Sequence, residues 1–484
     1  MRSCLYLVSL IALAGCPDRS LSAVQPTQGG AVVKKIPVSA DIDVLFVIDN
    51  SASTLDKQTV FAANFPKFVA ALDAFPTGRP NLHIGVIDTT VDIGAQGYST
   101  GGGAGCPSPD PGDNGLLQNT ARVAGCMPPN GRYLTDIKTS STTRQTNYSG
   151  TLDVALSCIA QVGASGCGFE AQLEAMKRAL DSSNTANAGF IRDGAYLAVI
   201  FLTDEDDAST KDASVFSLAD ANVGGHNDFR VQPLFAYNCD TPISNSAPGT
   251  YSHCTPRTDS YLQDPAYYAS FLSSVKDPAQ IVVAVIAAPP PGLMTNDNPP
   301  QTANSPTDVS VGPLTLSGNT QQLALQPSCT ATVNGNPAIG RPAVRLASFL
   351  SNFGSRGRFY SICQSDYSAA LTDIGQTLFN AISPCLEGPV DPTDVDPSNP
   401  GTQLDCDVND VTGGGSNAVP QPIVRCPMQD AATPTPNGPR PCYWIDQNTT
   451  TCPAPDTGYE LNIVRAQPPA PGTNVDVECA VKSM

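Results

Sequence analysis

The sequence predicts an α/β protein with a doubly wound, mostly parallel sheet, followed by a C-terminal disulfide-rich β module. There are two apolar runs, residues 44–48, followed directly by Asp49, and residues 195–202, followed by Thr203 and Asp204. Buried parallel strands have this pattern, because both of their faces are covered and their carboxyl ends carry ligand-binding loops. Between these runs, apolar residues from Phe61 to Leu72 recur at spacings of four, three and four, which indicates an amphipathic helix.

The other strands and helices are predicted from further apolar runs and helical spacings. Strands are expected at residues 82–87, 132–137, 280–286, 358–363, 459–464 and 474–479. Helices are expected at residues 151–161, 169–181, 260–276 and 367–382. Pro66 lies inside the first helical stretch, and we expect it to kink or divide that helix.

Composition changes along the 484 residues predict several parts rather than one compact domain. We expect a signal peptide at 1–16, a tether at 17–40, the α/β domain at 41–387, a Pro/Asp linker at 388–400 and a Cys-rich β module at 401–484. Long polar insertions interrupt the α/β domain at residues 88–131, 212–258 and 289–340. With regular connectivity, the last two insertions lie at the ligand-binding edge of the sheet, where long loops commonly carry specificity.

A candidate metal site is formed by oxygen-bearing side chains at the ends of the two central strands. Asp49, Ser51 and Ser53 follow the first strand, and Asp204 follows the second. Carboxylate and hydroxyl oxygens are hard donors that suit Mg²⁺, Ca²⁺ or Mn²⁺. Two plainer interpretations stay open: the first three residues cap the next helix, and the acids at 204–207 form a solvated turn.

The Asp-x-Ser-x-Ser spacing of residues 49–53 resembles the signature of the von Willebrand factor type A domain. Residues 202–204, Leu-Thr-Asp, are similar to the end of a later strand in that family. The resemblance implies a doubly wound fold whose loops form a metal-ion-dependent adhesion site. In such a site Ser51, Ser53 and Asp204 contribute to the metal shell, and one coordination position stays open for the carboxylate of a ligand.

The third loop of this site departs from the family pattern. The family's threonine falls on Cys167, and Ser165 or Glu170 could replace it. Glu170 could equally serve in the first turn of the following helix, where acids are favoured. The stretches 158–170 and 202–207 also resemble a group of large, Cys-rich bacterial surface lipoproteins that carry this domain.

The amino terminus predicts export. Met1 and Arg2 precede an apolar run at 5–14 that is too short to span a bilayer, as in a secretory signal. The run ends in Leu-Ala-Gly-Cys, which resembles a bacterial lipobox and implies lipidation of Cys16. An ordinary signal peptide with a chance cysteine is the alternative. We therefore expect a lipid-anchored protein of the bacterial cell envelope, with the outer membrane as the favoured destination.

The cysteines predict a disulfide framework. Setting aside Cys4 and Cys16 leaves 14 of the 16 cysteines, an even number as expected for an exported chain. Spacing suggests four pairs: Cys106 with Cys126, Cys158 with Cys167, Cys239 with Cys254, and Cys442 with Cys452. Cys385 is expected to bridge to the β module, since that module has five cysteines; a bond to Cys363 is the alternative.

Composition limits the classes of function. Acidic residues outnumber Lys and Arg by 44 to 26, giving a net charge of −18, which argues against nucleic acid as a partner. Three histidines and the lack of zinc motifs give no sign of a zinc enzyme. We expect a non-enzymatic binding protein whose divalent cation engages a carboxylate of a protein partner. The alternatives are an envelope lipoprotein whose metal only stabilises loops, and a metal-dependent hydrolase with Glu205 or Asp206 as general base.

Overall fold

The computed structural model describes most of the chain beyond residue 30. The described residues are 31–37, 41–75, 78–91, 113–140, 142–166, 168–211, 236–244, 246–291, 293, 307–315, 321–333, 335–412, 419–449, 452, 457–467, 469–470 and 473–481. The expected signal peptide with Cys16 therefore lies outside the described residues, as do Cys106 and Cys167.

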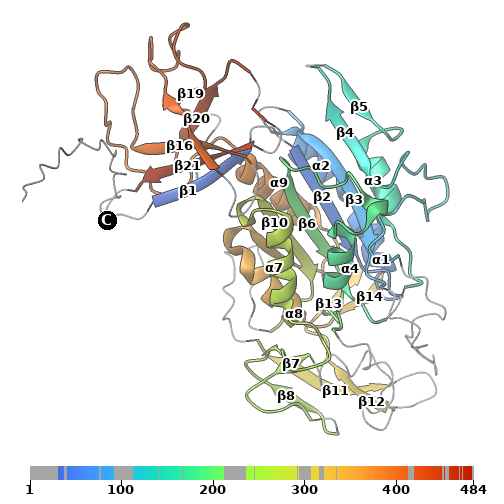
Figure 1. Ribbon diagram of the computed structural model, residues 1–484. Coiled ribbons are helices and arrows are strands. Elements are labelled where there is room, and N and C mark those ends of the chain that lie inside the picture. Colours follow the sequence, from blue (N-terminus) through green and yellow to red (C-terminus); the bar gives the residue numbers. More distant parts are fainter. Residues whose placement is uncertain are drawn as a thin grey trace, which may run out of the picture.

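A seven-stranded, mostly parallel sheet forms the centre of the α/β domain (Figure 1). Its strand order is β15-β10-β6-β2-β3-β4-β5. The strands are β2 (Asp41–Ile48), β3 (Asn81–Asp88), β4 (Leu134–Lys138), β5 (Arg144–Thr146), β6 (Tyr196–Leu202), β10 (Ile281–Ala287) and β15 (Gly357–Ser361). The pairs from β15 to β3 are parallel, whereas β4 and β5 continue the sheet in antiparallel fashion. Strand β5 was not expected from the sequence.

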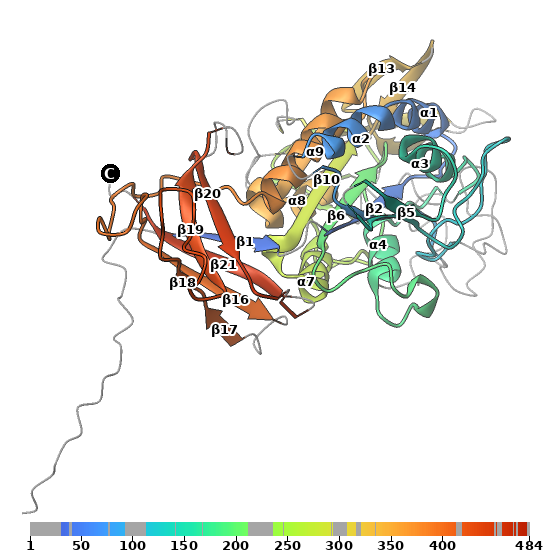
Figure 2. The same cartoon turned by 90° about the horizontal axis from the view of Figure 1, so that it is seen from above.

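Two helix layers cover this sheet (Figure 2). One layer contains α1 (Leu55–Ala63), α2 (Phe65–Asp73), α3 (Leu152–Ala160) and α9 (Ser368–Ile382). The other contains α4 (Gln172–Leu180), α7 (Pro265–Val275) and α8 (Val344–Leu350). Short 3-10 helices occur at Thr185–Asn187, Pro278–Gln280 and Ser351–Arg356. Pro66 lies in the first turn of α2 and separates it from α1, as expected from its missing backbone donor.

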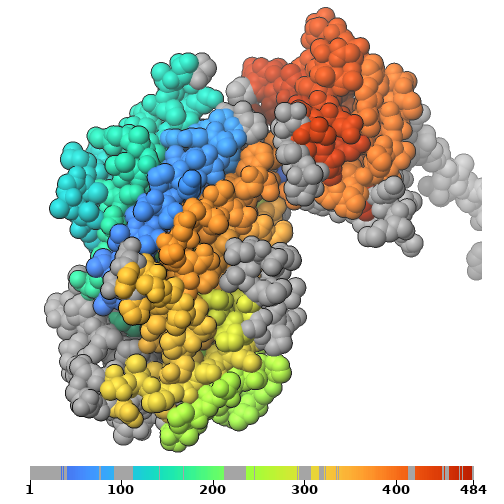
Figure 3. All heavy atoms as spheres, turned by 180° about the vertical axis from the view of Figure 1, so that it is seen from behind, coloured from blue at the N-terminus to red at the C-terminus, as the bar shows by residue number. Residues whose placement is uncertain are grey.

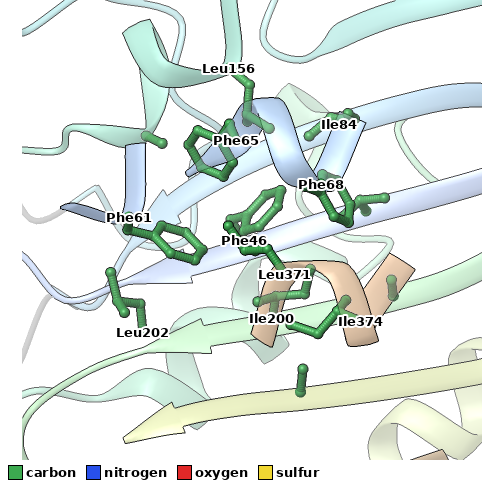
Figure 4. Packing of buried hydrophobic residues seen from close by; sticks show 14 of the residues in the cluster. Phe46, Phe61, Phe65, Phe68, Ile84, Leu156, Ile200, Leu202, Leu371 and Ile374 are labelled. Atoms are coloured by element: carbon green, nitrogen blue, oxygen red, sulfur yellow. The ribbon is translucent and has the colours of Figure 1, made fainter. Parts of the chain in front are cut away.

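The hydrophobic core has two halves because neighbouring residues of each central strand point to opposite faces. Phe46 of β2 faces α1, α2 and α9, and its ring makes edge-on contacts with Phe61, Phe65 and Phe68 at centroid distances of 5.8, 5.5 and 5.8 Å (Figure 4). Val47 belongs to the other half, with α4, α7 and α8. The phenylalanine spacing in the sequence is therefore a packing pattern.

Additional strands come from the two long insertions that follow β6 and β10. They are β7 (Tyr237–Asn238), β8 (Gly249–Tyr251), β9 (Thr255–Pro256), β11 (Val309–Thr315), β12 (Gln321–Leu325), β13 (Cys329–Val333) and β14 (Asn336–Gly340). Strands from the two insertions pair with each other, because β8 lies beside β11. Since β6 and β10 are parallel, both insertions begin at the same sheet edge, and β7, β8, β11 and β12 form one end of the molecule in Figure 1.

The C-terminal β module forms a second lobe beside the α/β domain (Figure 3). One sheet has the order β1-β21-β16-β17, from β1 (Ala31–Pro37), β16 (Cys406–Thr412), β17 (Val419–Pro422) and β21 (Thr473–Ala480). A second contains β18 (Val424–Arg425), β19 (Cys442–Gln447) and β20 (Tyr459–Val464). The module contacts the amino edge of the central sheet, where Gln280 Nε2 donates to Asn474 Oδ1 at 2.9 Å.

The prediction of a tether at residues 17–40 is wrong for residues 31–37. They form β1, which pairs antiparallel with β21 along its whole length. The backbone of β21 offers donors and acceptors on this side that a further strand satisfies. Lys34 of β1 is buried, and its Nζ donates to the carbonyl of Cys385 at 2.6 Å and lies 3.1 Å from a carboxylate oxygen of Glu387. Tertiary pairing thus recruits a segment whose sequence lacks a clear strand pattern.

Disulfides occur in both lobes. Among the described residues they join Cys126 with Cys158, Cys239 with Cys254, Cys329 with Cys363, Cys385 with Cys452, Cys406 with Cys479, and Cys426 with Cys442. The expected pair Cys239–Cys254 is present, and Cys385 joins the α/β domain to the β module as expected. Such a framework is typical of exported proteins. Among the helices that the structure describes, none has the length and apolar character needed to cross a bilayer.

Three of the expected pairs are wrong. In place of the pairs Cys106–Cys126 and Cys158–Cys167, the structure joins Cys126 to Cys158. The reason is that the segment before Cys126 packs beside the end of α3, where Arg122 donates to the carbonyl of Val162. In place of Cys442–Cys452, β18 pairs with β19 and brings Cys426 to Cys442. A short spacing in the sequence does not identify the bonded cysteines when the packing of strands and loops decides which segments are adjacent.

Candidate metal centre

The candidate site lies at the topological switch point of the central sheet. The chain leaves β2 toward β3 on one side, whereas β6 leads to β10 on the other, so the two connections diverge. Ligands of doubly wound sheets bind in this crevice at the carboxyl ends of the strands. Asp49 follows β2 directly, and its N–H donates to the carbonyl of Leu202, the last residue of β6, at 2.9 Å.

The four residues predicted as metal ligands lie together at this point. Ser51 Oγ and Ser53 Oγ are 3.2 Å apart, and Ser53 Oγ donates to Asp204 Oδ1 at 3.1 Å. The N–H of Ser51 donates to Asp49 Oδ1 at 2.8 Å, which fixes that carboxylate. The side chains of Asp49 and Asp204 are buried, whereas Ser53 is exposed. The candidate ligands therefore extend from two buried carboxylates to a serine at the surface.

Capping of the next helix does not explain these side chains. The residue at the start of α1 is Thr54, which makes no side-chain cap to the helix backbone. Its Oγ1 instead donates to the carbonyls of Asp49 and Ser51, at 2.8 and 2.9 Å. Thr54 thus stabilises the conformation of the loop. The hydroxyl oxygens of Ser51 and Ser53 do not cap the helix.

The acidic run 204–207 is buried, so the expectation of a solvated turn is wrong. Asp204 Oδ2 accepts a hydrogen bond from Lys57 Nζ at 2.8 Å, and both side chains are 2 % exposed. The Glu205 carboxylate pairs with the guanidinium of Arg341. Opposite charges allow these two acids to remain buried. The sequence alone does not show that Lys57 and Arg341 are the bases that pair with these two acids.

The other two acids organise helices on the far face of the sheet. Asp206 accepts hydrogen bonds from the N–H groups of Arg345 and Leu346 at the start of α8, at 2.8 and 3.1 Å. Asp207 accepts from the N–H of Leu173 in the first turn of α4 at 3.0 Å. Carboxylates are favoured at helix amino termini, where backbone donors lack partners. Glu205 and Asp206, the expected candidate bases of a hydrolase, are therefore engaged in structural contacts.

Among the residues that the structure describes, no basic side chain contacts Asp49 or Glu170 of this cluster. Burial and the nearby negative charge of Asp204 raise the pKa of Asp49 to about 7. Burial, followed by the charges of Glu205 and Asp49, raises the pKa of Glu170 well above its usual range. Glu170 Oε2 is buried and has no hydrogen-bond partner within the described part of the chain. The site therefore holds two carboxyl groups whose charge is not compensated by neighbouring side chains.

The third loop reaches the site through Asn50 and Glu170. The N–H of Gly166 donates to the carbonyl of Asn50 at 2.8 Å, and a Cβ at Gly166 would lie 2.0 Å from Asn50 Oδ1. This close approach explains the glycine. Ser165, the other candidate replacement for the family's threonine, is exposed, whereas Glu170 lies within electrostatic range of Asp49. Of the two candidate replacements, Glu170 is therefore the buried one beside Asp49, and Ser165 lies at the surface.

Thr203 is part of the candidate site and was not among the residues predicted for it. Its Oγ1 donates to Asp49 Oδ2 at 2.8 Å and accepts from Gln172 Nε2 at 2.8 Å. These two hydrogen bonds link Gln172 of α4, through Thr203 at the end of β6, to the carboxylate of Asp49 and fix the orientation of that carboxylate. A threonine directly before Asp204 was the available signal, because it lies at the carboxyl end of a central strand.

The residues present fit a hard divalent cation. Within the part of the chain that the structure describes, no group of three or more His, Cys, Asp or Glu side chains is arranged to hold a metal. Here, however, serine hydroxyls complete the set, as oxygen donors suit Mg²⁺, Mn²⁺ and Ca²⁺. Burial and the charge of Asp204 raise the pKa of Asp49, and Glu170 Oε2 has no hydrogen-bond partner among the described residues, so a bound cation would stabilise the ionised form of these carboxyl groups.

These pKa shifts predict an unusual pH dependence of stability in EDTA. Burial raises the pKa of Asp43 and of Asp206 to about 6, despite Arg192 and Arg345, and that of Asp49 to about 7. The folded protein then binds protons that unfolded aspartates release above a pKa of about 3.9. The contribution of these groups is present at low pH and is lost as pH rises through 6 to 7.

We expect the free energy of unfolding in EDTA to be higher at pH 5.5 than at pH 8, by on the order of 1–3 kcal/mol. The lowered pKa of half-buried His83 opposes this trend, but the three aspartates outnumber it. Urea unfolding at several pH values measures the slope. Asp49→Asn should reduce the slope, whereas the exposed control Asp193→Asn should not. A wild-type stability that instead increases steadily from pH 5.5 to 8 contradicts the raised aspartate pKa values.

Comparisons with known proteins add little to these observations. No protein-family profile matches the chain. No curated protein matches it either. Among solved structures, a pilus adhesin (RrgA) from Streptococcus pneumoniae superposes with 9% sequence identity and a TM-score of 0.23, covering 93% of this chain. The chain spans 57% of the length of that adhesin. A TM-score of this size does not establish a shared fold.

Proposed function

We propose that this chain is an exported binding protein with a von Willebrand factor type A-like domain. In this proposal Asp49, Ser51, Ser53 and Asp204 hold a divalent cation, Glu170 contributes in place of the family's threonine, and the cation engages a carboxylate of a protein partner. The observation that carries the proposal is the convergence of these oxygens at the switch point of the sheet, around Asp49, which no basic side chain of the described residues contacts.

The charge of the site supports capture of an anionic group. Serine hydroxyls are neutral ligands and take nothing from the positive charge of a bound divalent cation, which is the charge that attracts a carboxylate. Each ionised carboxylate offsets one unit of that charge, so Glu170 in place of the family's threonine weakens the attraction. The exposed position of Ser53 places this charge at the surface. Insertions that begin at the same sheet edge, including β8 and β11, are positioned to add contacts with a partner.

Direct cation binding is the first test. Chelator-treated protein titrated with Mn²⁺, Mg²⁺ and Ca²⁺ in a calorimeter should bind one ion, and Asp49→Asn and Ser51→Ala should each abolish detectable binding, because each removes an oxygen ligand. Asp193→Asn removes an exposed carboxylate at the opposite sheet edge and is the control. Equal affinity of the wild-type protein and both site variants would refute the site.

Partner capture is the second test, and it separates adhesion from a purely structural metal. Pull-down from a native cell envelope should recover a partner with Mn²⁺ but not with EDTA, and not with Ser51→Ala. Capture that persists in EDTA, together with a lower melting temperature, would select the alternative in which the ion only stabilises the loops.

We also propose lipid anchoring through Cys16; mass spectrometry of the mature amino terminus would show two or more acyl chains.

A further inference from the structure

Lys57 is a buried base at the candidate metal centre. It lies in the first turn of α1, four residues after Ser53, and its side chain is 2 % exposed. Its Nζ donates to Asp204 Oδ2 and to the carbonyl of Ser53, each at 2.8 Å, and lies 3.8 Å from Asp56 Oδ1. Two of the three groups around this ammonium therefore belong to residues predicted as metal ligands.

The ammonium and a divalent cation would compete for the same negative charge. Ser53 Oγ contacts Asp204 Oδ1, while Lys57 contacts the other oxygen of that carboxylate. An ion bound to Ser53 and Asp204 would lie only a few ångströms from the ammonium. In a buried setting, like charges at such separations repel by several kcal/mol, which corresponds to orders of magnitude in affinity. Lys57 also offsets the charge of Asp204, which otherwise would be buried without a basic partner.

We propose that Lys57 is a tethered counter-ion that competes with the divalent cation and sets the affinity of the site. This inference rests on the proposed function. In EDTA the ammonium satisfies Asp204 and keeps the loops in place. When a divalent cation binds, it takes over Asp204 and displaces the ammonium toward the surface near Ser53. This competition lowers the affinity of the site, so a higher concentration of divalent cation is needed to fill it.

Substitution of Lys57 tests the competition. Lys57→Gln removes the charge and keeps a hydrogen-bond donor, so Mn²⁺ measured by calorimetry should bind at least about tenfold more tightly than to the wild-type protein. Lys57→Arg keeps the charge and should bind with affinity close to that of the wild type. Lys276→Gln is the matched control: this buried lysine lies at the amino edge of the same sheet, where it donates to the carbonyls of Arg192 and Asp193.

A second measurement on the wild-type protein keeps the test valid if a variant fails to fold. Lysine acylation followed by mass spectrometry should leave Lys57 unmodified in EDTA and label it at saturating Mn²⁺, while Lys276 stays protected in both conditions. Tight wild-type binding with no gain in Lys57→Gln, or with Lys57 still protected, overturns the competition but leaves the proposed function intact. If neither protein binds Mn²⁺ or Mg²⁺, both proposals fall.

Discussion

Arg345→Met is expected to lower the free energy of unfolding by about 3–5 kcal/mol, because it breaks a buried ion pair and leaves a carboxylate unpaired. Arg345 is fully buried. Its Nη2 lies 3.0 Å from Asp207 Oδ2, and it donates to the carbonyls of Asp207 and Gln263 at 2.8 and 2.6 Å. Methionine occupies a similar volume but satisfies none of these groups.

The loss should extend beyond one contact. Asp206 and Asp207 bind the first turns of α8 and α4, so an uncompensated charge here loosens two helices of one layer and the strand end that carries Asp204. Urea unfolding monitored by circular dichroism measures the change. Arg358→Met is the control, because its carboxylate partner, Asp373, is 44% exposed, and surface pairs contribute under about 1 kcal/mol. Similar losses in the two variants would show that burial of Arg345 has no special effect.

Phe46→Ala is expected to lower the free energy of unfolding by about 3–5 kcal/mol, the range for buried aromatic residues replaced by alanine. Phe46 is fully buried at the centre of β2, among three other phenylalanines from α1 and α2 (Figure 4). Three helices of one layer meet over this ring, so neighbouring groups cannot easily close the resulting cavity. Because β2 also positions Asp49, the variant should weaken Mn²⁺ binding.

A half-buried phenylalanine of the same layer provides the comparison. Phe379 of α9 packs against Phe75 at 5.2 Å but is partly exposed. Phe379→Ala should cost less than half of the Phe46→Ala loss, because less apolar surface returns to water. Thermal and urea unfolding of both variants give the ratio. Equal losses would indicate that the centre of the core relaxes around the missing ring.

Local patterns were sufficient for the main elements of the α/β domain. The apolar run before Asp49 became β2, and the one before Asp204 became β6. The helical spacing after Asp49 became α1 and α2, divided at Pro66. These predictions succeed because side-chain periodicity and backbone restrictions depend on neighbouring residues only. Strand β5 and helix α8 were missed, since both are short and have little pattern of their own.

The sequence by itself determined the longer strands and helices of the α/β domain and the grouping of Asp49, Ser51 and Ser53 in one loop, because these depend on short-range spacing. Only the tertiary structure decided that Lys57 lies against Asp204, that Glu170 is buried near Asp49, and which cysteines bond to each other. The two members of each of these pairs lie in segments that are far apart in the sequence. Their pairing depends on how the two helix layers and the β module pack, and no local pattern records it.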